Sequence, residues 1–222
     1  FRSVEDASGA LVLLALWPLA LMFPVSVPFG LGQVFERLEA AVAHALQDTP
    51  WIDWLPMRDL ELQPLLPVSE VLCIGMGLML PSLLAFSVLR GLSQRLWMST
   101  LGLMLGVAAS SLSAALTYGP AHAWDWIGHE VLVGLALAAL CLGLLIRLPA
   151  RACLVLALVC LVWQLSLLNQ ASADVYFAQT LHNWEQGRFI RFHGLIQWLG
   201  WLWPYALLLY LVRRLSGSPA RD

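Results

Sequence analysis

Charged residues are scarce in this sequence: only 12% of its 222 residues are Asp, Glu, Lys or Arg, and Lys is absent altogether. A soluble domain has about 25% charged residues. The net charge of -2 without a basic stripe excludes a nucleic-acid binder, and the 60% hydrophobic content excludes a disordered or collagen-like chain. Long apolar runs recur from end to end, which excludes a soluble enzyme with one buried core. At about 20 apolar residues per crossing, we predict an all-α, polytopic membrane helix bundle with about six spans.

Several motifs are also missing: there is no HExxH, no P-loop, no dinucleotide-binding fingerprint and no CxxC pair. The four cysteines fall inside apolar segments, where we expect small buried side chains rather than disulfides. We therefore expect neither a cofactor nor a metal ion. One alternative stays open, in which His129 and His193 ligate a haem from two facing helices.

Six apolar segments define the predicted spans within a single domain of residues 1–222. They cover residues 8–25, 67–89, 96–116, 126–146, 152–168 and 195–212. Pro81 and Pro204 lie inside two of them, and we expect kinks rather than breaks because neighbouring helices or water can satisfy the freed carbonyls. The chain starts at Phe1 without Met and has no signal-peptide pattern. We therefore expect a domain excised from a longer protein.

The first long connection contains a predicted amphipathic helix at Leu31–Leu46. Its apolar face comprises Leu31, Val34, Phe35, Leu38, Val42 and Leu46, and its polar face comprises Glu36, Arg37 and Glu39. Such a helix is too polar to span and is typical of the membrane interface. A helix packed over the mouth of the bundle is the alternative.

Arginine placement predicts the orientation. With six spans, eight of the twelve arginines lie on the side of the termini: Arg2, Arg90, Arg95, Arg147, Arg151, Arg213, Arg214 and Arg221. Cytoplasmic loops carry the excess of positive charge, so we predict a multi-pass protein of the bacterial inner (cytoplasmic) membrane with both termini cytoplasmic. All five histidines and most acidic residues then fall on the outer side.

Three ionisable residues stand out near the start of the fourth span, Asp125, His129 and Glu130, and one more, Glu70, near the start of the second. If the helix begins near Asp125, this residue is a good N-cap, and His129 follows at i+4 on the same face, where a carboxylate can orient it as a general base. The alternative is a simple N-cap beside an interfacial histidine. Glu130 and Glu70 lie at the edges of apolar spans, where ionisable groups usually face the bundle interior; Glu70 also suits the first turn of a helix.

The densest polar run is residues 182–194, just before the last span. Arginine forks suit carboxylate or phosphate groups, so the run is a candidate anion site; an interfacial helix whose arginines pair with acidic loops is the alternative. The candidate ligand-binding residues are Arg188, Arg191, His182, Glu185, His122 and Glu70, and the candidate catalytic residues are His129, His193, Glu130 and Asp125. We predict that Asp125, His129, Glu130, Arg188, Arg191 and His193 form one outward polar cluster.

Five stretches of the sequence carry a family resemblance. They are Ala15–Ala20, Pro28–Gln33, Tyr118–Ala123, Gly187–Gly194 and Trp203–Tyr205. Together they resemble the C-terminal membrane region of proteobacterial VanZ-like proteins, whose namesake is linked to teicoplanin resistance. The resemblance implies a VanZ-like domain upstream of this one. The polar Pro-Gly-Arg turn of that domain, with Asp and Asn on the next helix, is missing here, so no functional residue is carried over.

These observations lead to three functional hypotheses. The first is a VanZ-like, non-catalytic protein of the cell envelope with an outward polar site for an envelope component. The second is an enzyme acting on a lipid-linked phosphate, with His129 or His193 as base and Arg188 and Arg191 as anion clamp. The third is a structural or assembly domain. Expected partners are membrane lipids, the upstream VanZ-like domain and a lipid-linked or cell-wall precursor, but no nucleic acid.

Overall fold

A computed structural model describes residues 2–23, 25–47, 49, 66–170 and 193–217. Over these residues the protein is all-helical, with seven α-helices, one short 3-10 helix and no strand. The elements are α1 (Arg2–Ala20), α2 (Phe35–Leu46), α3 (Pro67–Val88), α4 (Leu92–Tyr118), η2 (Pro120–His122), α5 (His129–Leu145), α6 (Ala150–Gln170) and α8 (His193–Ser216). The predicted all-α class is confirmed for this part of the chain.

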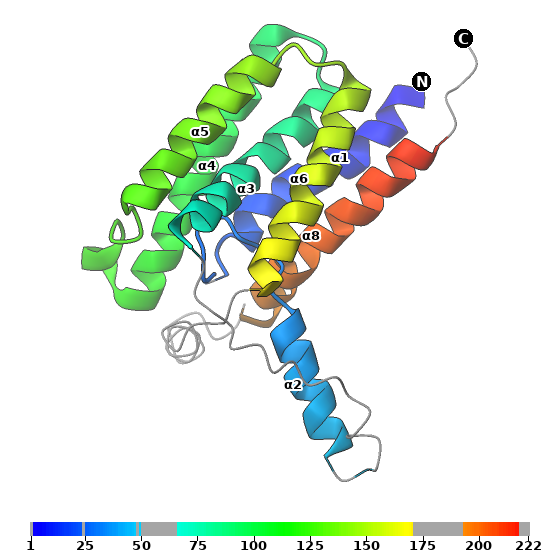
Figure 1. The fold of residues 1–222 in the computed structure, drawn as a ribbon. Helices are drawn as coiled ribbons and strands as arrows, with labels where there is room; N and C mark the ends of the chain where they lie inside the picture. The colour runs from blue at the N-terminus through cyan, green and yellow to red at the C-terminus, as the bar shows by residue number, and fades with distance from the viewer. Residues whose placement is uncertain (1, 24, 48, 50–65, 171–192, 218–222) are drawn as a thin grey trace.

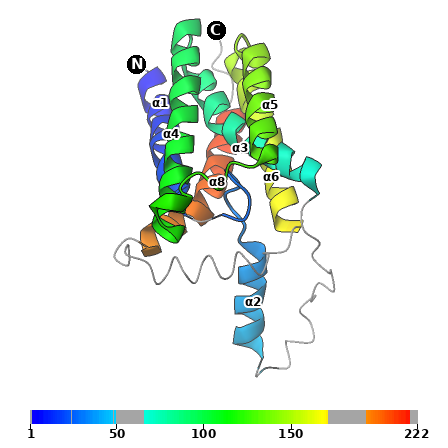
Figure 2. The same ribbon diagram turned by 90° about the vertical axis from the view of Figure 1, so that its left-hand side faces the viewer.

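Helix α3 lies at the centre of the bundle. It packs against α1, α4, α5 and α6, while α8 packs against α1 and α6 (Figures 1 and 2). A helix that is apolar on every face is suited to such a position, and every residue of α3 from Cys73 to Phe86 is buried. The prolines Pro81 and Pro204 lie within the continuous helices α3 and α8, so neither breaks its helix.

Within the described part of the chain, four helices are long and apolar enough to cross a membrane: Pro67–Val88, Leu92–Tyr118, Ala150–Asn169 and Gly194–Ser216. Two further apolar helices, Ser8–Ala20 and His129–Leu145, are shorter. At ~1.5 Å per residue they rise about 20 and 26 Å, against a hydrocarbon core of ~30 Å. The outer surface is apolar, with Trp97 72%, Leu140 63% and Leu144 75% exposed. The structure is thus consistent with a helical membrane protein.

One end of the bundle gathers the arginines that the sequence analysis placed together, except Arg221, which lies outside the described residues. The α3–α4 turn, the α5–α6 turn, the start of α1 and the end of α8 all lie there (Figure 1). Arg95 differs from the prediction, because it lies inside α4 rather than in the turn and is only 7% exposed. Its guanidinium donates to the carbonyls of Phe86 (2.8 Å), Leu89 (2.9 Å), Ile146 (2.6 Å) and Leu148 (2.8 Å). Because the last carbonyls of a helix have no intrahelical partner, Arg95 caps both α3 and α5.

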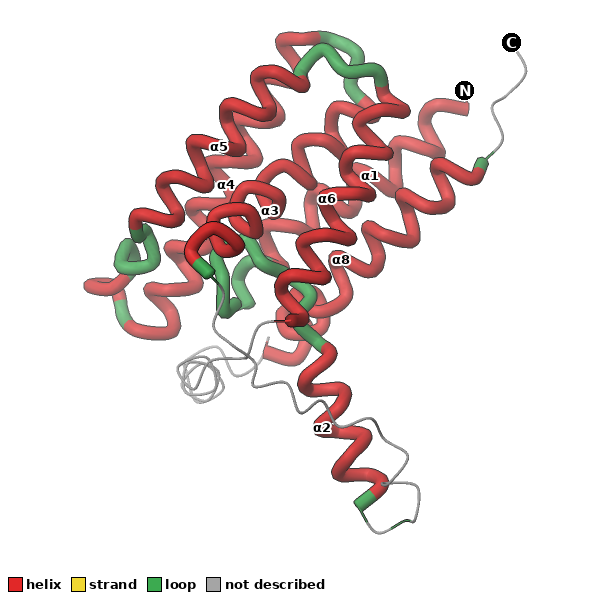
Figure 3. The backbone as a smooth tube through the Cα atoms, viewed as in Figure 1, coloured by secondary structure: helices red, strands yellow, loops and turns green. Residues whose placement is uncertain are grey.

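The segment between α1 and α2 is a loop that enters the bundle (Figure 3). Phe29, with φ of 63°, is 1% exposed and stacks on Trp17 of α1 at a ring-centroid distance of 6.4 Å. The side-chain amide of Gln164 donates to the Phe29 carbonyl at 3.2 Å and to the Cys73 carbonyl at 3.1 Å. Non-helical backbone at such depth needs polar partners from the protein, and Gln164 supplies one. The start of the predicted first long connection is therefore buried within the bundle.

The amphipathic helix starts later than predicted. Helix α2 begins at Phe35, whereas Leu31 belongs to the buried loop and is 3% exposed. Leu38 on the helix itself is 54% exposed. Helix α2 projects beyond the end of the bundle opposite the arginines (Figures 1 and 2). It is not among the candidate spans; its place in the membrane interface stays a prediction.

Candidate functional site

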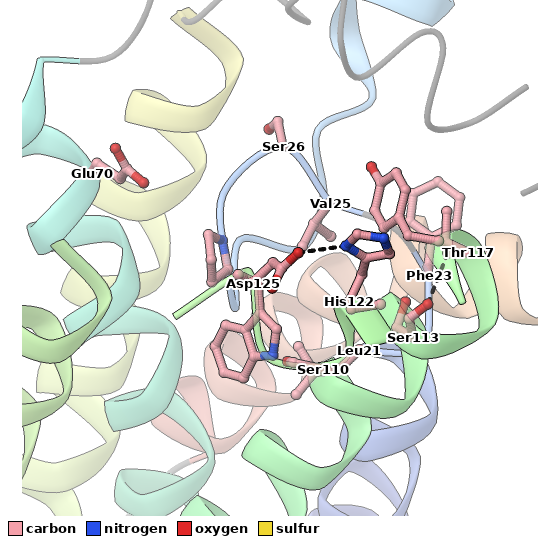
Figure 4. A pocket seen from close by; sticks show the side chains of 14 residues that line it. Leu21, Phe23, Val25, Ser26, Glu70, Ser110, Ser113, Thr117, His122 and Asp125 are labelled. Carbon is pink, nitrogen blue, oxygen red and sulfur yellow. Dashed lines mark hydrogen bonds and ion pairs between the residues drawn. The ribbon is translucent and has the colours of Figure 1, made fainter. Parts of the chain in front are cut away.

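A pocket of about 380 Å³ opens at the end of the bundle opposite the arginines (Figure 4). Three elements build it: the inserted loop after α1, the last two turns of α4 with the connection to α5, and the first turn of α3. The lining residues are Leu21, Phe23, Val25, Ser26, Pro28, Glu70, Ser110, Ser113, Ala114, Thr117, Tyr118, His122, Asp125 and Trp126. Three residues selected from the sequence, Glu70, His122 and Asp125, therefore share one cavity.

His122 and Asp125 form the most polar contact of the pocket. The His122 Nδ1 atom lies 2.6 Å from the Asp125 Oδ2 atom, and the two side chains are 56% and 68% exposed. The predicted arrangement, with Asp125 as N-cap of the helix and His129 on the same face, is wrong. Helix α5 begins only at His129, and Gly128 is the N-cap residue in an extended conformation. Asp125 instead lies in the preceding turn, where its carboxylate reaches back to the end of η2.

Trp126 fixes the turn that carries this pair. Its indole N–H lies 3.1 Å from both the Ser111 Oγ atom and the Ala123 carbonyl. The Trp126 ring also meets the buried Phe29 ring edge-on at 5.8 Å. The inserted loop and the α4–α5 connection are therefore joined through aromatic packing, so the pocket depends on both.

The hydroxyl groups of α4 line the side of the pocket across from Glu70. Ser113 is 7% exposed and donates to the Met22 carbonyl at 2.9 Å, which holds the end of α1 against α4. Thr117 donates to the Ser113 carbonyl at 2.8 Å. Sequence analysis missed these residues, although hydroxyl groups repeating at Ser110, Ser113 and Thr117 in an otherwise apolar span were a usable signal. They mark the polar stripe of α4.

Glu70 enters the pocket from the first turn of α3, across from the α4 hydroxyls in Figure 4. Its carboxylate makes no hydrogen bond or ion pair with any other residue that the structure describes. Glu130 of α5 repels it electrostatically but does not line the pocket. A carboxylate that lines a pocket and has no partner among the described residues can accept hydrogen bonds from a ligand.

The chemistry available here is that of a carboxylate, a carboxylate–imidazole pair and several hydroxyls. The pair holds one imidazole nitrogen and leaves the other without a partner among the described residues. In the described part of the chain no group of three or more His, Cys, Asp or Glu side chains is placed to hold a metal ion.

Of the remaining predicted site residues, three lie within the described part of the chain and four lie outside it. His129 and Glu130 start α5, which packs on α3, whereas His193 starts α8, which packs on α1 and α6. The others, His182, Glu185, Arg188 and Arg191, lie outside the described residues. The cluster predicted between residues 125–130 and 188–193 thus stays a prediction.

Comparisons of this chain with protein-family models, curated proteins and solved structures found no match.

Proposed function

We propose that this chain is a multi-pass protein of the bacterial inner membrane whose outward pocket binds an envelope component rich in hydroxyl or amine groups. The observation that carries the proposal is the composition of the pocket. Glu70 and Asp125 offer carboxylates, the α4 hydroxyls lie across from Glu70, and no arginine is among the described lining residues. Such a lining favours ligands that donate hydrogen bonds over anionic ligands, because a phosphate group would be repelled by two carboxylates.

The orientation follows from the arginines. Positive charge concentrates on cytoplasmic ends, which favours a cytoplasmic arginine end and therefore an outward pocket. This orientation is compatible with six crossings if the two shorter helices also cross the membrane. Ser8–Ala20 would then be extended by the loop residues that follow it, and His129–Leu145 by those that precede it. In that arrangement α2 lies at or beyond the outer interface, and both termini are cytoplasmic.

A second candidate function is catalysis on a lipid-linked phosphate. The specific observation in its favour is the 2.6 Å contact between His122 and Asp125, because a carboxylate-oriented imidazole is a common general base. His122 would then replace His129 or His193 as the base, with Arg188 and Arg191 as the anion clamp. A purely structural role and the relation to VanZ-like proteins, with an upstream VanZ-like domain as partner, rest on the sequence alone.

The test is recovery of the bound molecule from native membranes. The protein is purified as wild type, Glu70→Gln and Asp125→Asn, and small molecules that elute with it are quantified by mass spectrometry. Glu130→Gln is the matched control, since Glu130 is an acidic residue at the same end that does not line the pocket. We expect one envelope molecule whose recovery falls about tenfold in the two pocket variants, as expected for the loss of about one charged hydrogen bond, and is unchanged in the control.

Two results would decide against the proposal. If no molecule depends on Glu70 or Asp125, the pocket is not a binding site. If the purified wild type releases phosphate from a lipid-linked phosphate and His122→Ala does not, the catalytic candidate replaces it.

A further inference from the structure

The arginine end of the bundle contains a second, larger cavity, of about 900 Å³. It is bounded by the α3–α4 turn, the α5–α6 turn and the end of α8. Four arginines line it, Arg90, Arg95, Arg147 and Arg214, and none of its described lining residues is acidic. The cavity is therefore a basin of positive charge.

The arginines of this basin have different roles. Arg95 is buried, and four of its five guanidinium N–H groups donate to backbone carbonyls, so it adds charge but offers little to a ligand. Arg90 and Arg147 are exposed and make no hydrogen bond or ion pair with another described residue. Their forks are suited to the oxygens of a phosphate group.

An apolar groove of about 250 Å³ begins beside this basin. It runs between α4 and α5, which both pack on α3. Leu96 of α4 and Leu135, Gly143 and Ile146 along α5 are among its lining residues. Leu96 and Ile146 are the chain neighbours of Arg95 and Arg147, and the Arg95 Nη1 atom donates to the Ile146 carbonyl at 2.6 Å. The groove and the basin thus lie next to each other.

The dimensions of the groove indicate what fills it. From Leu135 to Ile146 the α5 wall rises about 16 Å at ~1.5 Å per residue, which is half of the ~30 Å hydrocarbon core. The volume of the groove is smaller than the ~300–1,000 Å³ of a drug-sized site, and most of its lining residues are apolar. One acyl chain of a single leaflet matches this length and this apolar lining.

We propose that these two features form one binding site for an anionic phospholipid of the leaflet at the arginine end. Arg90 and Arg147 hold its phosphate, and the groove between α4 and α5 holds an acyl chain. Basic pockets beside membrane helices recognise anionic headgroups by charge. The site lies at the opposite end from the outward pocket and does not depend on the function proposed for it.

The experiment measures lipid binding to the delipidated, detergent-solubilised protein by native mass spectrometry. The probes are phosphatidylglycerol, phosphatidylcholine with the same chains, and inorganic phosphate as competitor. We expect about tenfold or stronger preference for phosphatidylglycerol, because each arginine near a headgroup contributes roughly a fivefold gain. The preference should disappear in the double variant Arg90→Gln, Arg147→Gln and persist in Arg213→Gln, whose side chain is exposed on the same end but does not line the basin.

A second pair of variants tests the acyl-chain groove. Gly143 lines the groove, so Gly143→Leu fills it, whereas Gly102 of α4 does not line it and Gly102→Leu is the control. A Cβ atom at either position has no neighbour within 4 Å, so both variants should fold. We expect Gly143→Leu to weaken phosphatidylglycerol binding about tenfold, as for the loss of about two buried methylene contacts, and Gly102→Leu to leave it unchanged.

Three results would overturn the proposal. They are equal binding of the two lipids, equal loss in Arg213→Gln and in the double variant, and full displacement by inorganic phosphate, which would indicate a site for a free anion. Equal effects of the two glycine variants on lipid binding would show that the acyl chain does not lie in this groove.

Discussion

Replacement of Arg95 should destabilise this protein more than replacement of any exposed arginine. In Arg95→Met, the carbonyls of Phe86, Leu89, Ile146 and Leu148 lose a charged donor. A hydrogen bond to a charged group contributes about 1.5–3 kcal/mol net. Since water reaches the exposed ends of the turns, we count only two of the four bonds as lost without replacement, which gives about 3 kcal/mol or more. The guanidinium also lies 5.3 Å from the centre of the Phe86 ring, and that contact is lost too.

Arg95→Lys should recover only part of this stability. An ammonium group presents its donors from one point, whereas the planar guanidinium reaches carbonyls on two different turns. We expect Arg95→Lys to lie about midway between the wild type and Arg95→Met. Arg90→Met is the matched control, because Arg90 lies in the neighbouring α3–α4 turn, is exposed and makes no hydrogen bond with a described residue.

The cysteines provide the assay. Cys73, Cys153 and Cys160 are free and buried, so a thiol-reactive fluorogenic dye reports their exposure during thermal unfolding in detergent. A loss of about 3 kcal/mol corresponds to a midpoint lower by about 6–12 °C for a chain of this size. The reasoning about Arg95 is refuted if Arg95→Met shifts the midpoint no more than Arg90→Met does.

Three further predictions concern the inserted loop and the topology. Gly77→Ala should lower the unfolding midpoint by several degrees, because its Cβ atom would lie 2.5 Å from the Phe29 carbonyl oxygen; Gly102→Ala, with open space around the Cβ atom, should not. Gln164→Leu should cost about 1–3 kcal/mol by leaving the buried Phe29 carbonyl without its donor, and a midpoint equal to that of the wild type in the same dye assay would contradict this. A C-terminal reporter should be active only in the cytoplasm, and periplasmic activity would reverse the proposed orientation.

Much of the bundle could be predicted from the sequence because the membrane constrains each segment separately. Every backbone group in hydrocarbon needs an internal partner, so a long apolar segment has to be helical whatever its neighbours are. The extents of the predicted spans at 67–89 and 152–168 accordingly lie close to those of α3 and α6. The same holds for the arginine end, since the turns that join consecutive helices carry the charge.

The candidate site was predicted only in part. Glu70, His122 and Asp125 were selected singly, as polar groups at span edges, yet nothing local showed that they line one cavity. The role given to Asp125 was wrong because the start of the helix depends on Gly128, whose extended backbone delays α5 until His129. With that shift, Asp125 meets the residue three positions before it instead of the residue four positions after it.

Composition and spacing along the chain determined that this protein is a bundle of long apolar helices, consistent with a membrane protein, and which turns share an end, because both follow from the solvent that suits each segment. Only the tertiary structure decided that Phe29 lies inside the bundle and that Arg95 caps two helices. Phe29 is 135 residues from Gln164, and Arg95 is 51 residues from Ile146. Contacts over such separations depend on which helices become neighbours, and α3 sets this by packing against four of them.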